Sequence, residues 1–447
     1  MNPRLSAFLS SRMIDRRDGH RARVLSALAE KTRINALAQD GIENHRREKL
    51  AALLRHAREK IPFYATLLPE PRGICAGNSL ELLRTLPVVT RTHIQQNSDS
   101  FRDATAPVSI ADATGGSTGT PMRFFVDRET QIARESSLMW ADSLAGWSCG
   151  ERIAMLWGSD RDVRGAMSKW KSTLRWVVEN RRWFNAFDMG PERMAEFHSA
   201  MERFSPHLIV AYSGSAFLYA RFLRQRGIRP SYPLRALVCS AEICAPEMRR
   251  EIEDVFGRPV FDRYGSREFG AIAAENESHG GLLLNHADFI VEIGAPVNGN
   301  STGPLIVTYL HNRAMPFLRY DTGDLSSFQT ASTLRPVQGR RSDTIRTADG
   351  KMIHGEFFTH LLYGCPDVSQ FQFVQETQDD YRLVVVARRD AAGTMEIKWR
   401  RDILEAVGPA SRLTIEYRDT IPPLASGKHK FTVSMIGEPA GAELGAN

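Results

Sequence analysis

The sequence has few cysteines and no long apolar run. Its five cysteines are scattered, odd in number and never in C-x-x-C spacing: Cys75, Cys149, Cys239, Cys244 and Cys365. That pattern argues against a disulfide framework and against a structural zinc site. No apolar run is long enough to span a bilayer, and polar residues interrupt the N-terminal apolar stretch before a signal-peptide core develops. These absences predict a protein of the reducing cytoplasm without a membrane span.

A large excess of one charge is also missing. The 447 residues include 58 Lys and Arg against 52 Asp and Glu, which gives a net charge of +6. This modest excess favours anions in general, and a small anionic substrate explains it as well as nucleic acid does. Internal repeats and low-complexity segments are absent too. A chain of this length exceeds one ordinary core, so two or more domains are expected.

Residue periodicity predicts an α/β fold with two domains. Residues 1–100 begin with amphipathic helices, residues 101–280 form an α/β core, and residues 281–338 are mostly β. Together they make a large, multi-layer N-terminal domain with mixed sheets and helices. Residues 339–447 are expected to form a polar hinge followed by a small, mobile α+β domain that acts as a lid.

The α/β core shows the clearest alternation. Strands are expected at 208–214, 234–242 and 259–266, and helices at 216–227 and 246–257. Such alternation is typical of a sheet with parallel strands. Ligands bind beyond the carboxyl ends of these strands, so a site is expected around residues 213–215, 240–242 and 264–268.

A glycine-rich stretch, TGGSTGTP at 114–121, contains the G-x-S-x-G signature of a serine-hydrolase nucleophile elbow. An elbow needs a helix directly after the serine, whereas residues 120–126 predict a strand. A P-loop is also excluded, because its lysine is missing here and the later Gly427-Lys428 is followed by His429. What remains is a hairpin-like loop whose amides and hydroxyls can donate to phosphate oxygens. An ordinary glycine-rich turn is the alternative.

Four further stretches follow this loop in a fixed order: YGSRE at 264–268, RYDTGD at 319–324, GRRSD at 339–343 and SGK at 426–428. The series resembles the adenylate-forming superfamily of acyl-CoA synthetases. The nearer resemblance is to the phenylacetate–CoA ligase family and its capsular-polysaccharide and coenzyme F390 synthetase-like branch. KIPFYATLL, YGSREFGAIAAE and AMPFLRYDTGD carry this closer likeness.

The resemblance implies an AMP-forming acid–thiol ligase. ATP and a carboxylic acid would give an acyl-adenylate and pyrophosphate, and CoA would then displace AMP to form a thioester. The cofactors implied are ATP and Mg²⁺, with CoA as co-substrate. Transfer to a carrier protein, an amine or a polysaccharide is the alternative, and a homodimer is left open.

The same resemblance assigns roles to individual residues. The loop that holds the β- and γ-phosphates matches Ser117, Thr118, Gly119 and Thr120. In the central motif, Tyr264 would lie against adenine, Gly265 and Ser266 near the α-phosphate, and Glu268 on Mg²⁺. Asp324 would accept both ribose hydroxyls, and Arg340 would contact ribose and phosphate. Lys428 would reach the α-phosphate and carboxylate oxygens during adenylation. Lys428, Glu268 and Thr118 are the expected catalytic residues.

Three departures from the family pattern affect these assignments. Glu242 matches an adenine-flanking loop whose middle residue is usually glycine and here is Ala241. The hinge residue, often aspartate, is Ser342. Some relatives carry cysteine and histidine ligands after the central glutamate. Here Ala274-Glu275-Asn276 leads to His279 with no cysteine, so no zinc is predicted, and His279, His286 and His354 are expected to be structural or surface residues.

The acid itself is the least determined part of the prediction. The acyl pocket of this fold would include Trp147, Trp157, Tyr212 and Phe217, and such aromatic residues suit an aryl or arylacetic acid. Aromatic side chains are more often core residues than pocket walls. No charged residue stands out as a partner for an amino-acid substrate.

Two other classes of function compete with the ligase. A nucleic-acid-binding protein could use the Arg-rich segments at 11–24 and 161–182. It leaves the five ordered motifs unexplained, and charge runs are usually solvated faces. A serine hydrolase is weakened by the strand predicted after Ser117. A degenerate, non-catalytic relative is disfavoured because Glu268, Asp324, Arg340 and Lys428 occur together.

Overall fold

The structure is a computed structural model. It describes residues 19–113, 122–157, 180–186, 191–296, 301–338, 344–349, 352–354, 356–363, 365, 368–387, 389–422 and 431–436. The chain divides into two compact units. The first comprises Met1–Cys244 and Ile252–Val337, and the second comprises Gln338–Asn447 together with Ala245–Glu251.

The described chain begins with helices, as periodicity predicts. They are α2 (His20–Asn35), α3 (Gln39–Lys60), α4 (Pro62–Ala65), α5 (Ser79–Thr85) and α6 (Arg91–Gln96), with short 3₁₀ turns η1 (Pro71–Gly73) and η2 (Ser98–Phe101). The longest, α3, buries Leu50, Leu54 and Ala57 on one face. It ends at Ile61 in an extended conformation because proline follows, and the residue before proline is pushed out of the helical region.

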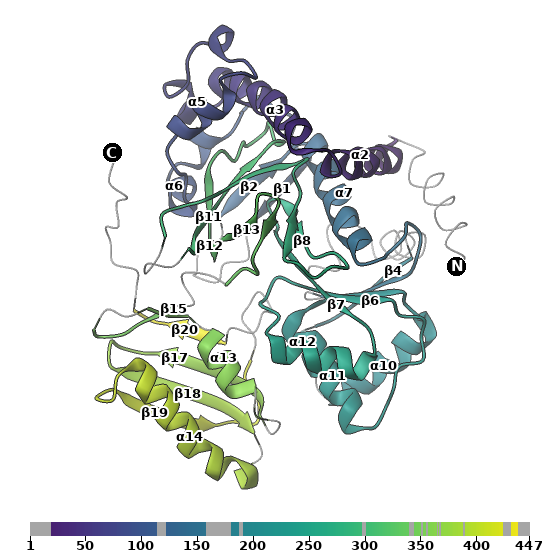
Figure 1. Ribbon diagram of the computed structural model, residues 1–447, viewed down its shortest axis with the longest axis vertical. Coiled ribbons are helices and arrows are strands. Elements are labelled where there is room, and N and C mark those ends of the chain that lie inside the picture. Colours follow the sequence, from purple (N-terminus) through teal and green to yellow (C-terminus); the bar gives the residue numbers. More distant parts are fainter. Residues whose placement is uncertain are drawn as a thin grey trace. The chain divides into compact units, whose positions relative to one another are not determined.

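A nine-stranded mixed sheet organises the first unit (Figure 1). Its order is β13 (Phe328–Thr330), β14 (Thr333–Leu334), β9 (Leu282–Leu284), β8 (Gly270–Ala274), β7 (Val260–Ser266), β6 (Ala236–Ser240), β5 (Leu208–Tyr212), β3 (Ile153–Leu156) and β4 (Arg181–Phe184). The strands from β7 to β4 are parallel, and those from β8 to β13 pair antiparallel.

The predicted alternation between residues 208 and 266 is confirmed. Strands β5, β6 and β7 alternate with α11 (Ser213–Gln225) and α12 (Pro246–Phe256). One detail differs from the prediction: α11 begins directly at Ser213, so residues 213–215 form the first turn of a helix and not a loop. Gly214 lies in this first turn, where backbone N–H groups have no acceptor within the helix and bond to groups outside it. A glycine is therefore tolerated at this position.

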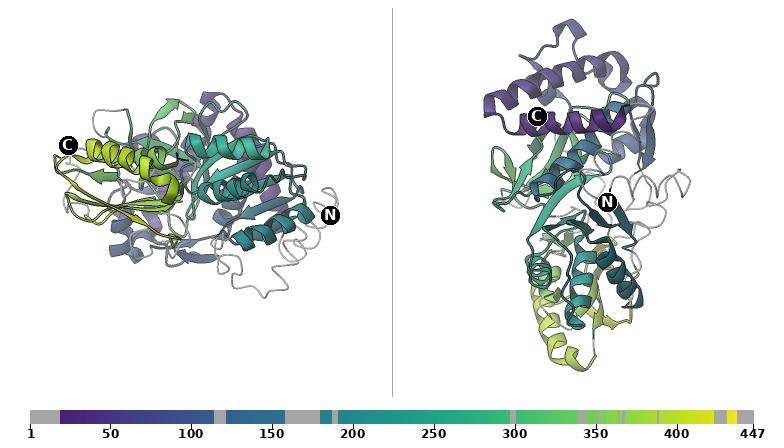
Figure 2. Two further views of the ribbon diagram at one scale, coloured as in Figure 1. Left: turned by 90° about the horizontal axis from the view of Figure 1, so that it is seen from below. Right: turned by 90° about the vertical axis from the view of Figure 1, so that its right-hand side faces the viewer.

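Helices cover both faces of the parallel strands. On one face α10 (Pro191–Phe204), α11 and α12 lie side by side (Figures 1 and 2). On the other face α2 and α7 (Arg128–Leu144) pack on the sheet. The core of that second face contains Val24, Ile132, Met139, Met155, Val210, Val238 and Phe261. Side chains alternate between the two faces of a strand. The residues two positions after Met155, Val210, Val238 and Phe261 therefore also point to the α7 face.

Smaller sheets complete the first unit. The hairpin β1 (Ile110–Ala113) and β2 (Arg123–Val126) is antiparallel, as is the three-stranded sheet β10 (Phe289–Ile293), β11 (Gly303–Tyr309) and β12 (Tyr320–Ser326). Their apolar side chains form a single core with α3, α4 and β8, in which Phe269 contacts Phe289, Tyr309 and Phe317 edge to face. Strands β9 to β14 all lie within residues 281–338.

A buried charge network ties α2 to the segment before β10. The Lys31 ammonium lies 2.5 Å from Asp288, and the exposed fractions of the two side chains are 5% and 1%. The same carboxylate contacts His311 at 2.9 Å and accepts a hydrogen bond from the Asn285 amide at 2.8 Å. These contacts hold the pKa of Asp288 well below its usual range, against the opposing effect of burial.

The second unit is a small α+β domain. Its four-stranded sheet has the order β19 (Arg412–Tyr417), β18 (Asp380–Ala387), β17 (Val368–Gln375) and β20 (Thr432–Ser434), and a separate hairpin joins β15 (Thr344–Arg346) to β16 (Met352–His354). Helices α13 (Glu356–Tyr363) and α14 (Arg389–Val407) pack against this sheet. Phe358 stacks on Phe373 with ring centroids 3.7 Å apart. The predicted fold class, α/β with an α+β C-terminal domain, is confirmed.

Candidate active site

Two of the predicted motifs meet in the first unit. The Tyr264 hydroxyl, from the end of β7, donates a hydrogen bond of 2.7 Å to Oδ2 of Asp324 in β12, although the two residues lie 60 positions apart. Both side chains are partly buried. Gly323 lies within β12 directly before Asp324 and has φ of 80°, a left-handed conformation that favours glycine. The contact joins the predicted adenine and ribose positions.

The central motif also requires its first glycine. A Cβ at Gly265 would lie 2.1 Å from the backbone oxygen of Gly270, so no other residue fits without moving the chain. The ladder between β7 and β8 shifts register at this point, between Tyr264 and Gly265. Ser266 follows at the exposed end of the strand. This bulge turns the strand end towards solvent, where a ligand can reach it.

Glu268 lies in the turn between β7 and β8 and is only 7% exposed. Within the described parts of the chain its carboxylate has no hydrogen-bond donor and no cation as a partner. The next residue upstream, Arg267, lies 3.4 Å from the carbonyl oxygen of Ala113 and 3.7 Å from Asp112. This contact connects the central motif to β1, whose last residue immediately precedes the glycine-rich stretch.

The glycine-rich stretch is the connection of a hairpin. β1 precedes it and β2 follows it, with Ala113 paired to Arg123. The strand predicted after the serine is thus confirmed, and the helix that a nucleophile elbow needs does not follow in the described residues. Ser117, Thr118, Gly119 and Thr120 themselves lie outside the described residues, as do Arg340, Ser342 and Lys428. Their predicted roles stay predictions.

Glu242 caps a helix at the carboxyl edge of the sheet. Its Oε2 accepts a hydrogen bond of 2.9 Å from the Gly214 amide in the first turn of α11, and its carbonyl accepts one from the Ser213 hydroxyl. A carboxylate is favourable there because it meets unsatisfied N–H groups at the positive end of the helix dipole. The preceding Ala241 has φ of 67°, the left-handed region in which glycine is preferred. The glycine usual at this position in the family thus has a conformational reason.

The predicted acyl-pocket residues fall in two places. Trp157, just past β3, stacks on Tyr212 at the end of β5 with ring centroids 4.3 Å apart. Trp147 lies before the start of β3, where it is 5% exposed and its indole N–H donates to the Glu151 carbonyl. The indole of Trp147 is engaged within the core, so we keep only Trp157 and Tyr212 in the candidate pocket.

A buried cluster of charges beside this aromatic stack was not anticipated from the sequence. Arg263 of β7 donates a hydrogen bond of 2.9 Å to Asp142 of α7, and Arg181 of β4 lies 3.7 Å from the same carboxylate. Burial lowers the pKa of Arg263, Asp142 opposes that shift and Arg181 adds to it. The only signal in the sequence is an arginine directly before Tyr264, in a strand that begins with the apolar residues Val260 and Phe261.

Other titratable groups look structural. Burial, reinforced by Arg46, lowers the pKa of His286 to about 3, so its imidazole is neutral at pH 7. His279 lies 3.5 Å from Glu275. In the described part of the chain, no three His, Cys, Asp or Glu side chains group as a metal site would require. No helix there is long and apolar enough to cross a membrane.

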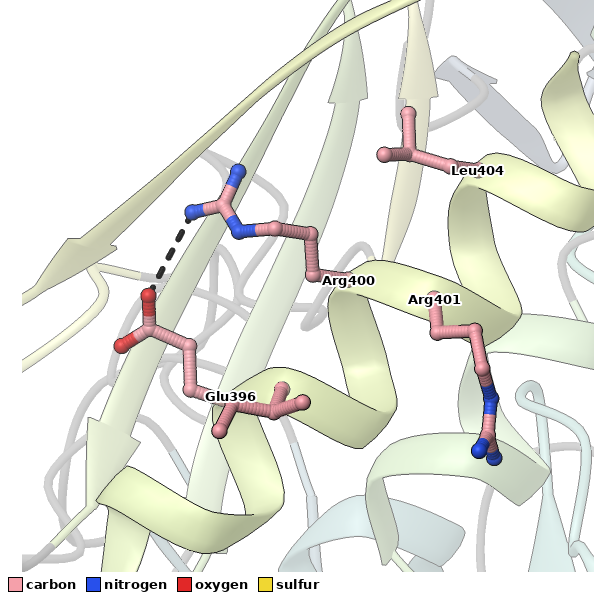
Figure 3. A pocket seen from close by; sticks show the side chains of 5 residues that line it. Glu396, Arg400, Arg401 and Leu404 are labelled. Carbon is pink, nitrogen blue, oxygen red and sulfur yellow. Dashed lines mark hydrogen bonds and ion pairs between the residues drawn. The ribbon is translucent and has the colours of Figure 1, made fainter. Parts of the chain in front are cut away.

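A groove on α14 in the second unit is lined by Glu396, Ile397, Arg400, Arg401 and Leu404 (Figure 3). Arg400 and Glu396 are paired with each other at 3.3 Å. None of the predicted site residues lies in it, and we assign it no role.

Known proteins resemble this chain over most of its length. Residues 345–435 match the family model of the CapK C-terminal domain. The chain is 24% identical over 407 residues to Protein CapK of Staphylococcus aureus. This match covers 88% of the chain and 89% of Protein CapK. It is also 24% identical over 332 residues to phenylacetate-coenzyme A ligase of Pseudomonas putida, covering 71% and 73% of the two chains. The chain is a homologue of CapK and of the phenylacetate-coenzyme A ligases.

Solved structures share the fold of this CapK homologue. 2-Hydroxyisobutyryl-CoA ligase in the postadenylation state, in complex with 2-HIB-AMP, matches with a TM-score of 0.66 and 19% identity over 88% of this chain and 89% of that one. Anthranilate CoA ligase in complex with anthranoyl-AMP matches with a TM-score of 0.55 and 15% identity over 74% of this chain and 66% of that one. The resemblance to adenylate-forming ligases seen in the sequence is therefore confirmed at the level of fold.

Proposed function

We propose that this CapK homologue activates a carboxylic acid with ATP and transfers the acyl group to CoA. In the first step a carboxylate oxygen attacks the α-phosphorus, the bond to the β-phosphate breaks, and pyrophosphate leaves. In the second step the CoA sulfur attacks the acyl carbon and AMP leaves, which makes the enzyme an AMP-forming acid–thiol ligase. The homology to phenylacetate-coenzyme A ligases supports this proposal.

The observation that carries the proposal is the hydrogen bond between Tyr264 and Asp324. It places an aromatic ring and a carboxylate side by side at the carboxyl edge of the sheet, where a nucleoside could lie on the ring and offer its ribose hydroxyls to the carboxylate. The Tyr264 hydroxyl donates its hydrogen bond to Oδ2 of Asp324, which holds this side chain in one rotamer. Such fixed polar groups contribute binding and orientation, which is most of what phosphoryl and nucleotidyl transfer asks of a protein.

The residues present also fit a Mg²⁺ ion bound together with the phosphates of ATP. Mg²⁺ prefers carboxylate oxygen and keeps several other oxygen ligands from water or phosphate. Glu268 offers a buried carboxylate that no described donor or cation engages. When bound, the ion would neutralise negative charge that develops on the phosphate oxygens. Lys428 and Arg340 would supply the protein's own positive charge, and the hydroxyls and amides of 117–120 would hold the leaving pyrophosphate.

Several finer predictions belong to the proposal. We expect an aryl or arylacetic acid, since Trp157 and Tyr212 offer a flat apolar wall. Domain rotation about Ser342 would alternate the two half-reactions. A cytoplasmic location and a homodimer also stay predictions. Transfer to a carrier protein, an amine or a polysaccharide stays the alternative to transfer to CoA.

The test is pyrophosphate release from Mg-ATP across a panel of aryl, fatty, hydroxy and amino acids, each with and without CoA. Sustained release that requires both one class of acid and CoA would support the CoA ligase. Release that stops near one equivalent per enzyme with CoA present would favour another acceptor. A protein that binds ATP but releases no pyrophosphate with any acid would contradict the proposed chemistry.

Two substitutions should separate binding from chemistry. Asp324→Ala removes the acceptor of the ribose hydroxyls, so the Kd for ATP should rise about 10-fold to 100-fold. Lys428→Ala should lower the adenylation rate by at least about 100-fold and change the Kd for ATP by less than about 3-fold, since its charge acts on the transition state. Calorimetric ATP binding and single-turnover adenylation measure the two effects. An unchanged adenylation rate in Lys428→Ala would remove that lysine from the mechanism.

A further inference from the structure

Three paired residues form a row across the carboxyl edge of the sheet. Tyr212 of β5 pairs with Ser240 of β6, and Ser240 pairs with Arg263 of β7. Partners in adjacent strands share a face of the sheet, so these three side chains are neighbours on the α7 face. Trp157 extends the row by stacking on Tyr212. The row therefore runs from the stacked rings of Trp157 and Tyr212 to the guanidinium of Arg263.

Hydrogen bonds fix the charged end of this row. The Ser240 hydroxyl donates to the Arg263 carbonyl at 2.9 Å, and the Arg263 side chain donates to Asp142 at 2.9 Å. The side chains of Arg263 and Asp142 are 6% and 3% exposed. Both groups are thus desolvated and held in place, as in a site that recognises one particular group of a ligand.

Arg181 approaches the same carboxylate from the other side. It is 3.7 Å from Asp142, beyond hydrogen-bond range, and its side chain is 22% exposed. Within the described chain no acceptor lies within hydrogen-bond distance of this guanidinium. Among the described residues, the two guanidiniums thus face one shared carboxylate, which only Arg263 engages by a hydrogen bond, and Asp262 also acts on the charge of Arg263. A guanidinium that lacks an acceptor in a largely desolvated position is costly unless an anion joins it.

We propose that the acid activated by this enzyme carries a second anionic group, which Arg181 and Arg263 recognise on the α7 face of the sheet. This inference rests on the proposed function and deepens it. The reacting carboxylate would lie towards Tyr264 and Glu268, the body of the acid along Tyr212 and Trp157, and the second anionic group against the guanidiniums. A planar guanidinium suits a carboxylate well, because its fork of N–H groups matches the two oxygens.

The experiment compares acids that differ only in the second group. Benzoate is paired with terephthalate and isophthalate, phenylacetate with 4-carboxyphenylacetate, and hexanoate with adipate, and acid-dependent pyrophosphate release gives kcat/KM for each. We expect at least one diacid to exceed its matched monoacid by about 10-fold or more, the effect of one charge-assisted hydrogen bond. The monoamide of the preferred diacid, similar in shape but neutral at that end, should lose most of this advantage.

The variant that tests the residue is Arg181→Met. It keeps the Arg263–Asp142 pair and removes the second guanidinium, so the preference for the diacid should fall about 10-fold through KM for the acid, with KM for ATP unchanged. Arg182→Met is the control, because Arg182 lies in the same strand on the opposite face, over the ring of Phe184. It should leave the ratio of diacid to monoacid as it is.

Two results would overturn the inference while leaving adenylation intact. One is a wild-type enzyme that uses monoacids as well as their matched diacids. The other is an Arg181→Met variant whose preference is unchanged. A third result, no acid-dependent release with any compound although ATP binds, would instead overturn the proposed function and the inference with it.

Discussion

Two buried charge clusters in the first unit differ in how fully their carboxylate is satisfied. Asp288 has a single ammonium, from Lys31, and its remaining capacity is filled by His311 and the Asn285 amide. Asp142 faces two guanidiniums, one hydrogen-bonded and one at 3.7 Å. The carboxylate of the first cluster is fully engaged, whereas in the second, among the described residues, the Arg181 guanidinium has no acceptor within hydrogen-bond distance. This difference is the basis of our proposal that the Asp288 cluster serves the fold and that the Asp142 cluster serves a ligand.

The largest effect is expected from a substitution that breaks the Asp288 cluster. Lys31→Met leaves the Asp288 carboxylate buried without its cation, which should lower the free energy of unfolding by about 3–5 kcal/mol. Urea denaturation followed by circular dichroism measures this loss. Lys49→Met, an exposed lysine on α3, is the control and should change stability by less than about 0.5 kcal/mol. A loss below about 1 kcal/mol in Lys31→Met would show that the network does not stabilise the fold.

A smaller effect on the free energy of unfolding is expected when the pH is lowered. The pKa of Asp288 lies below its unfolded value, so its contribution to stability is complete above an unfolded pKa of about 3.9 and is lost as pH falls towards the folded pKa. The difference in unfolding free energy between wild type and Asp288→Asn should thus stay constant from about pH 7 to 5. Below about pH 4 it should shrink by up to about 1.4 kcal/mol per pH unit. A difference that stays constant down to pH 3 would contradict the assignment.

The smallest effect on stability is expected in the second cluster. Arg181→Met leaves the hydrogen-bonded pair of Arg263 and Asp142 in place, and it removes a charge that the fold does not need. The free energy of unfolding should change by less than about 1 kcal/mol. The same denaturation experiment measures it beside Lys31→Met. A loss of about 3 kcal/mol or more would make Arg181 a structural residue and erase the contrast between the clusters.

Local patterns predicted much of the fold and the order of the motifs. The alternation from 208 to 266 is visible in the sequence because buried parallel strands are apolar runs and the intervening helices end at glycine. The conformational need for glycine is also visible locally, as the left-handed φ of Ala241 shows at a position where relatives usually have glycine. The motif comparison placed Tyr264 and Asp324 in one site before their contact was known.

What the sequence could not predict depends on contacts between distant segments. The pairing of Asp142 with Arg263 spans 121 positions, and the hydrogen bond between Tyr264 and Asp324 spans 60. Which face of a strand an arginine occupies follows from register with strands elsewhere in the chain. Trp147 and Trp157 look alike in the sequence, but they lie at opposite ends of β3, and only the order of strands in the sheet distinguishes them.

Formation of acyl-adenylates by this chain can be measured as acid-dependent exchange of labelled pyrophosphate into ATP, without any acceptor. We expect exchange that requires both Mg²⁺ and an acid, that is fastest with an acid carrying a second anionic group, and that is strongly reduced in Lys428→Ala. Absence of exchange with every acid, in a folded protein that binds ATP, would contradict the proposed function.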